Sequence, residues 1–74
     1  MKSNDSYWKE FLRRYRVSKT LREIRTKKNL RLRDLSSITG YSKQYINNVQ
    51  EILIKPNEDF IQKLWKLENE NSNT

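Results

Sequence analysis

The chain has 74 residues and a net charge of +7, and it contains no cysteine and no histidine. A chain of this length forms one small domain, and without those two residue types it lacks disulfides, the usual zinc ligands and the common covalent catalytic pairs, so we expect no metal, no cofactor and no enzyme activity. The longest apolar run has three residues, far fewer than the roughly 20 of a membrane span, and the N-terminus lacks the hydrophobic region of a signal peptide, so we expect a cytoplasmic protein with no membrane partner.

The first predicted element is an aromatic helix over residues 6–16, which follows a polar lead-in at residues 1–5. Five large side chains recur on one face of this helix, namely Tyr7, Trp8, Phe11, Leu12 and Tyr15. Such a stripe indicates a buried face, so we expect it to pack in the core. A basic amphipathic helix of this kind also suits a protein partner or a membrane surface, and these readings stay open as alternatives.

A second helix is predicted from about Ser18 to Lys28. Its apolar residues Val17, Leu21 and Ile24 lie about 140° around the helix axis from the aromatic stripe. This rotation predicts a break near Arg16, with Ser18 as the candidate cap of the new helix and Thr20 with Glu23 as an alternative capping box. Asn29 is expected to end the helix in the left-handed conformation.

Two short helices are predicted next, over residues 32–39 and from Ser42 to about residue 50. Gly40 ends the first of them because glycine tolerates a positive φ, and Ser42 caps the second. The second presents Tyr45, Ile46 and Val49 as its inward candidates.

An apolar connector ending at Pro56 leads to a last helix that is capped by Asn57. Residues 69–74 are expected to form a disordered tail. The sequence therefore predicts an all-α, compact five-helix domain over residues 6–68.

Residues 32–50 show the pattern of a helix-turn-helix. Two helices that cross through a short turn need a residue without Cβ in the turn and a small residue at the crossing, and Gly40 and Ser36 occupy those positions. Here the chain resembles the lambda-repressor-like (Cro/repressor, Xre-type) DNA-binding domains over about residues 17–67. The residues that match are Leu21 to Arg25, Leu30, Leu35 to Ser42, Ile46, Val49 and Pro56.

The sequence departs from this family at several positions. Arg31 stands where the family usually has a capping Ser or Thr, and Gln50 stands where it often has a Glu that pairs with an Arg of the first family helix. Arg25 matches that Arg, so we expect a hydrogen bond to Gln50 in place of the ion pair, or Glu51 as a substitute partner. The family's C-terminal fifth helix, through which many members dimerise, has no counterpart here, and residues 7–16 form an extra helix at the other end.

The resemblance implies a sequence-specific regulator of transcription that binds double-stranded DNA, in its simplest form a small repressor of phage or mobile-element type. The helix after Ser42 would enter the major groove. Amide side chains pair with adenine edges and lysine with guanine edges, so the expected base contacts are Lys43, Gln44, Asn47 and Asn48. The expected backbone contacts are Ser42, Arg31, Arg33 and Tyr45, with core packing as the equal alternative for Tyr45.

The distribution of charge fits a polyanionic partner. Residues 1–33 hold twelve basic and three acidic side chains, and neutralising phosphates with such charges releases condensed counterions. A solvated basic face without a partner is the alternative. A second class of function also stays open: a small helical protein-interaction module or inhibitor, built on a helix-turn-helix scaffold that does not use DNA.

We expect a homodimer at least on DNA, because one domain of this size reads only half of a two-fold operator. The candidate contact is the apolar connector, formed by Ile52, Leu53 and Ile54. The N-terminal helix is the competing candidate, either for the dimer or for a protein partner.

Overall fold

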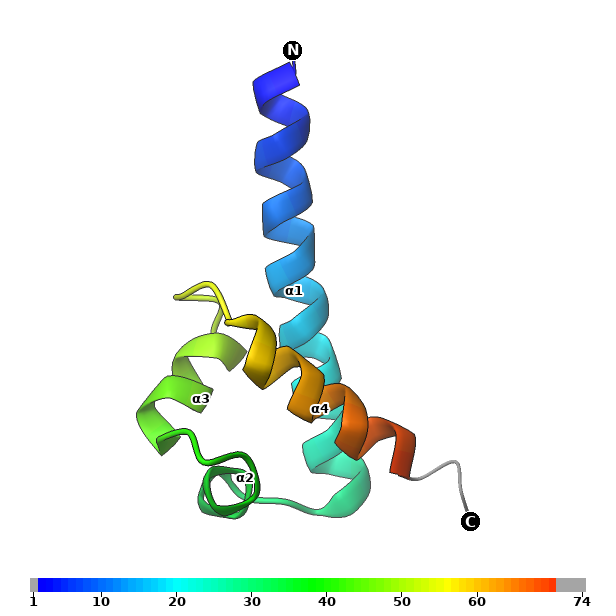
Figure 1. The fold of residues 1–74 in the computed structure, drawn as a ribbon, viewed down its shortest axis with the longest axis vertical. Coiled ribbons are helices and arrows are strands. Elements are labelled where there is room, and N and C mark those ends of the chain that lie inside the picture. The colour runs from blue at the N-terminus through cyan, green and yellow to red at the C-terminus, as the bar shows by residue number, and fades with distance from the viewer. Residues whose placement is uncertain (1, 71–74) are drawn as a thin grey trace.

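A computed structural model of the chain describes residues 2–70, with side-chain surroundings from residue 7 onward. It contains four helices and, within these residues, no strand: α1 (Lys2–Lys28), α2 (Leu32–Thr39), α3 (Lys43–Gln50) and α4 (Glu58–Glu70). The last three helices gather around the C-terminal half of α1, while its N-terminal half projects beyond them (Figure 1). The all-α prediction is confirmed, but the prediction of five helices is wrong.

The structure has four helices because the first two predicted helices form one helix, α1. This helix runs through the predicted break near Arg16 and includes residues 2–5 of the predicted lead-in. No glycine or proline occurs between residues 2 and 28, so nothing in the sequence interrupts the backbone hydrogen bonds of a helix there. The rotation of the apolar stripe by about 140° is therefore a change of face along one helix, not a break. At the other end, α4 includes residues 69 and 70, so the prediction of a disordered tail is wrong for these two residues, and residues 71–74 lie outside the described part.

The hydrophobic core lies between the C-terminal half of α1 and the three shorter helices. Phe60 of α4 is fully buried, and the rings of Tyr41 and Tyr45 meet it edge-on at centroid distances of 5.2 and 5.3 Å. Ten apolar residues form the buried cluster: Val17, Leu21, Ile24, Leu35, Ile46, Val49, Phe60, Ile61, Leu64 and Leu67.

The predicted helix ends are mostly confirmed. Asn29 and Gly40 adopt positive φ values of 55° and 82°. The Ser42 hydroxyl accepts a hydrogen bond from the Tyr45 amide at 3.1 Å, and the Asn57 side chain accepts one from the Phe60 amide at 2.9 Å. These caps satisfy amides in the first turns of α3 and α4 that have no partner inside the helix.

Ser18 is not a cap, contrary to our prediction. It is buried in the middle of α1, and its hydroxyl donates to the backbone carbonyl of Gln50 at 2.6 Å. That carbonyl belongs to the last turn of α3, where carbonyls lack intrahelical partners. A polar residue thus lies on the core face because it joins α1 to the end of α3.

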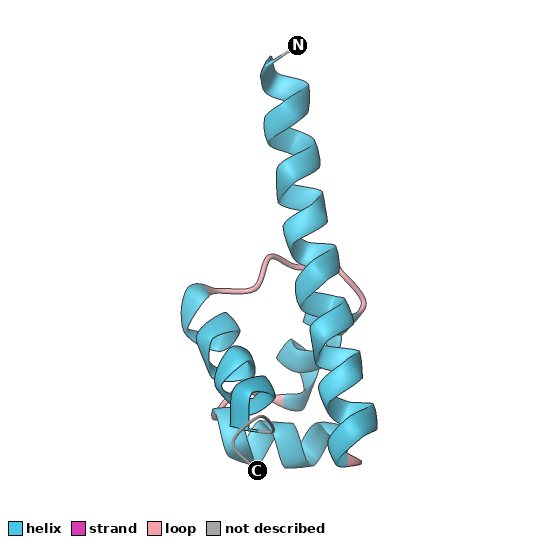
Figure 2. Ribbon diagram, turned by 90° about the vertical axis from the view of Figure 1, so that its right-hand side faces the viewer, coloured by secondary structure: helices cyan, strands magenta, loops and turns pink. Residues whose placement is uncertain are grey.

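The aromatic stripe of α1 is not part of the core, again contrary to our prediction. Its five side chains are between 45% and 73% exposed. Figure 2 shows from a second side that this half of α1 extends beyond the other helices. A straight helix cannot turn two faces that lie about 140° apart toward one small core, so the stripe faces outward.

Candidate nucleic-acid interface

A three-residue turn fixes the angle between α2 and α3. Gly40 takes the left-handed conformation, and its amide donates to the Ser36 carbonyl at 2.9 Å. The buried Thr39 hydroxyl donates to the Leu35 carbonyl at 2.8 Å and accepts from the Tyr41 amide at 3.3 Å. Because the polar groups of the turn are paired in this way, α3 has a defined orientation relative to α2.

The outer face of α3 is polar over its whole length. Lys43 and Gln44 are exposed, and Asn47 and Asn48 are half-buried. The Gln44 amide nitrogen donates to the Asn48 side-chain oxygen at 3.2 Å. On the opposite side of the helix, Ile46 and Val49 are buried. All four predicted base-contacting residues therefore share one face, which is the face turned away from the core.

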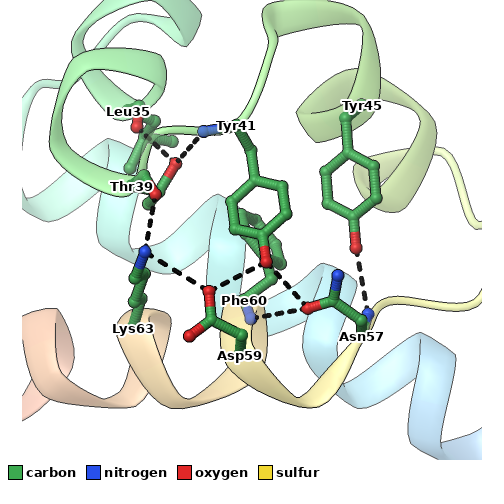
Figure 3. A network of polar contacts seen from close by, with 8 residues as sticks. All are labelled: Leu35, Thr39, Tyr41, Tyr45, Asn57, Asp59, Phe60 and Lys63. Atoms are coloured by element: carbon green, nitrogen blue, oxygen red, sulfur yellow. Dashed lines mark hydrogen bonds and ion pairs between the residues drawn. The ribbon is translucent and has the colours of Figure 1, made fainter.

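A polar network anchors the start of α4 to the turn (Figure 3). The Tyr41 hydroxyl lies 2.8 Å from Asp59 Oδ2 and 3.0 Å from Asn57 Oδ1. Lys63 forms an ion pair with Asp59 at 3.3 Å and donates to the Thr39 carbonyl at 3.0 Å. Only the pair of Asp59 and Lys63, four residues apart on one helix, is local. The contacts that join α4 to the turn link residues 16 to 24 positions apart, so no sequence pattern predicts them.

Tyr45 belongs to the same region. Its ring stacks on Tyr41 at a centroid distance of 4.8 Å, and its hydroxyl accepts a hydrogen bond from the Asn57 amide at 2.9 Å. The structure therefore places Tyr45 against the core, which was one of its two predicted alternatives.

Asp59 and Tyr41 perturb each other's titration. The hydrogen bond from Tyr41, followed by the contact with Lys63, lowers the pKa of Asp59 below its usual value of 3.8. The same hydrogen bond to Asp59, together with partial desolvation, raises the pKa of Tyr41 above 10.0. Both shifts favour a charged Asp59 beside a neutral Tyr41 across the neutral pH range.

These shifts predict a loss of stability in acid. A carboxyl with a depressed pKa stabilises the fold above its unfolded-state pKa, and this contribution disappears as the pH falls through the folded-state pKa. Asp59→Asn should therefore lower the melting temperature at pH 7, and the difference from wild type should shrink below about pH 4. Thermal melts followed by circular dichroism between pH 2 and pH 7 measure this. Glu68→Gln, on the same helix but outside the network, is the control. An unchanged melting temperature for Asp59→Asn at pH 7 contradicts the assigned role.

Basic side chains lie at the start of α2. Arg31 and Arg33 are both exposed. Arg31 occupies the N-cap position of α2, where its amide donates to the Asp34 carboxylate at 2.8 Å. Its guanidinium cannot accept a hydrogen bond from the first turn. Of the two hydrogen bonds of a capping box, therefore, only the one from the Arg31 amide to Asp34 forms. Asp34, three residues after the cap, was the signal in the sequence for this arrangement.

The predicted bond between Arg25 and Gln50 is present. Arg25 donates to the Gln50 side-chain oxygen at 2.6 Å and to the Leu30 carbonyl at 3.1 Å. Glu51 does not replace Gln50 as the partner of Arg25, because it pairs with Arg22 at 3.7 Å. These contacts hold the C-terminal end of α3 against α1.

The three residues of the apolar connector have different surroundings. Ile54 packs against the core, Ile52 is half-buried, and Leu53 is 66% exposed. Ile52 has a φ of 62°, in a region that β-branched residues rarely adopt. The connector therefore offers Leu53 as its main exposed apolar side chain, not a patch of three.

No family model, curated protein or solved structure matches the chain in comparisons with known proteins. Among the described residues, none of the four helices is both long and apolar enough to cross a membrane. The resemblance to lambda-repressor-like domains therefore depends on the residues and spacings of the chain itself.

Proposed function

We propose that the protein is a sequence-specific regulator of transcription that binds double-stranded DNA and reads the major groove with α3. The observation that carries the proposal is the face of α3 formed by Lys43, Gln44, Asn47 and Asn48, opposite the buried Ile46 and Val49. The groove is wide enough for one helix, and lysine and amide side chains match the edges of guanine and adenine. A helix with this face and a rigid turn before it suits base recognition.

The groups around α3 support binding to the DNA backbone. The N-terminus of α3, capped by Ser42, presents backbone amides of the kind that contact phosphates. Arg31 and Arg33 are exposed at the start of α2, the helix that lies across the backbone in helix-turn-helix docking. The net charge of +7 favours association with a polyanion. The resemblance to lambda-repressor-like domains makes a small repressor of phage or mobile-element type the specific form of the proposal.

Selection of bound duplexes from a random pool tests this function directly. We expect enrichment of one sequence, arranged as a palindrome if two copies bind together. If a folded protein enriches no sequence at moderate salt, the proposal is wrong.

A protein-interaction module remains the second candidate, because the aromatic stripe of α1 is exposed and large exposed apolar patches mark interaction sites. The same selection distinguishes the two candidates. Enrichment of a sequence supports the DNA-binding function, whereas retained binding to a protein partner without any enrichment supports the module.

A substitution of Arg31 should change the stability of the protein and its affinity for DNA in opposite directions. Serine at this N-cap position would accept a hydrogen bond from the first turn of α2, so Arg31→Ser should raise the free energy of unfolding by about 1 kcal/mol. It should also weaken specific and non-specific duplexes equally, and lower the slope of log affinity against log salt by about one. Urea denaturation and binding titrations at several salt concentrations measure the two effects.

Arg33→Gln is the matched variant for this test. It removes an exposed arginine of the same helix at a position that is not a cap, so it should weaken binding without increasing stability. A loss of affinity for only one sequence, in either variant, would contradict a contact to phosphate.

A further inference from the structure

The projecting half of α1 carries an apolar face that no other part of the described chain covers. We define it as the aromatic face: Tyr7, Trp8, Phe11, Leu12 and Tyr15. Trp8 meets Tyr7 and Phe11 edge-on at centroid distances of 6.2 and 6.1 Å. Trp65 of α4, itself 49% exposed, lines one groove together with Leu12 and extends this surface toward the body of the domain.

We propose that two copies of the chain pair through the aromatic face, with their α1 helices antiparallel and crossing near Phe11. A fully buried aromatic side chain covers about 150–250 Å². Since the five side chains are between 45% and 73% exposed, the face offers roughly 500 Å² per copy. Complete burial of two such faces covers about 1,000 Å², which is the lower limit for a specific interface. A monomer rarely exposes a larger apolar patch than this.

The helix dipoles favour one direction of the pair. In an antiparallel pair the two dipoles oppose each other, whereas in a parallel pair ends of equal sign lie side by side. The basic residues of this segment do not determine the direction, because Arg13 pairs with Glu58 and Arg14 with Glu10. In an antiparallel pair that crosses at Phe11, Lys9 lies level with Arg13 of the other copy, so the two directions differ little in charge repulsion.

The position of the crossing gives the offset of the two copies of α3 along the direction of α1. Ser18 and Arg25 bind the C-terminal end of α3, and the midpoint between them lies about eleven residues from Phe11. At 1.5 Å per residue this is about 16 Å, so the two α3 helices are offset by about 32 Å along α1. Each α3 packs on the core face, about 140° around α1 from the aromatic face, so the two α3 helices lie on the outer sides of the pair. The pairing itself does not depend on the proposed function.

Sedimentation equilibrium of the full chain without DNA tests the pairing. Wild type should sediment as a dimer, and the double variant Trp8→Ala, Phe11→Ala should sediment as a monomer with half the mass. Leu53→Ala is the control, since it removes the exposed side chain of the competing connector, and it should remain dimeric. Alanine maintains helix propensity, and circular dichroism confirms folding of each variant. A monomeric wild type, or a dimer that only Leu53→Ala disrupts, overturns the proposal.

Cysteine cross-linking tests the antiparallel direction, because the chain has no cysteine of its own. Phe11→Cys, at the crossing point, should form a disulfide-linked dimer on mild oxidation. Tyr7→Cys alone should not, because residue 7 of one copy lies about 12 Å along the axis from residue 7 of the other, beyond the reach of a disulfide. A mixture of Tyr7→Cys and Tyr15→Cys should cross-link.

The outcomes of the cross-linking test are distinct. Cross-linking of Tyr7→Cys by itself shows a parallel pair, and failure of both Phe11→Cys and the mixture shows that the face does not pair. Neither experiment uses DNA, so a failure of the pairing is distinguishable from a failure of DNA binding.

Discussion

Replacing Lys43, Gln44 and Asn48 together by alanine should lower the affinity for a selected operator by at least about 100-fold, since each good base contact contributes about 1–3 kcal/mol. Gln44 and Asn48 share a hydrogen bond, so their two effects are not additive. The fold should persist, because Ile46 and Val49, the buried residues of α3, are unchanged. Titration of the operator at moderate salt, followed by fluorescence anisotropy, measures the loss.

A matched pair on α4 controls for the general loss of polar surface. Gln62 and Lys66 are exposed residues of the same chemical types, and replacing both by alanine should leave recognition of the operator unchanged. Single variants at Lys43, Gln44 and Asn48 should each relax the preference at one or two base positions. If the triple variant binds the operator as well as wild type does, α3 is not the recognition helix.

The short helices could be predicted from the sequence because their ends carry local signals. Gly40 with its positive φ and the caps Ser42 and Asn57 act within three or four residues of themselves. Such signals do not depend on how distant elements pack. The bounds predicted for α2 and α3 therefore agree with the structure.

The break predicted near Arg16 shows where the same reasoning fails. A rotated apolar stripe fits two helices, and it fits equally one helix with different faces along its length. Composition favours the single helix, since residues 2–28 contain no glycine or proline. The prediction of a break rested on the rotation of the stripe, and it holds only if both apolar faces pack in the same core. An apolar residue need not be buried, because more than half of a typical protein surface is formed by apolar atoms.

Contacts between distant residues were predictable only where the family resemblance supplied them. The resemblance pointed to Arg25 and Gln50, and the bond between them is present. It gave no hint of the bond from Ser18 to the Gln50 carbonyl or of the contact between Tyr41 and Asp59. Ser18 and the Gln50 carbonyl lie 32 residues apart, and no pattern in a single sequence predicts that two such distant groups meet. These contacts can be identified only in the folded structure.

Phe60→Ala should destabilise the protein by about 3–5 kcal/mol, because it removes a fully buried ring and leaves a cavity. Phe60 is 0% exposed and supports both Tyr41 and Tyr45. Below about 70–80 residues a single core rarely supplies more than about 3–5 kcal/mol, so this variant should be largely unfolded at 37 °C. Urea denaturation followed by circular dichroism measures the loss.

Trp8→Ala is the counterpart, since it removes an even larger ring from the same chain. Trp8 is 58% exposed, so in dilute solution the free energy of unfolding of the variant should differ from that of wild type by no more than about 0.5 kcal/mol. At concentrations where two copies pair, wild type gains stability from association and the variant does not. The difference between them should therefore increase with protein concentration. A loss of 3 kcal/mol or more that is independent of concentration would show that the Trp8 ring packs within its own copy, and the aromatic face would then not be free to pair.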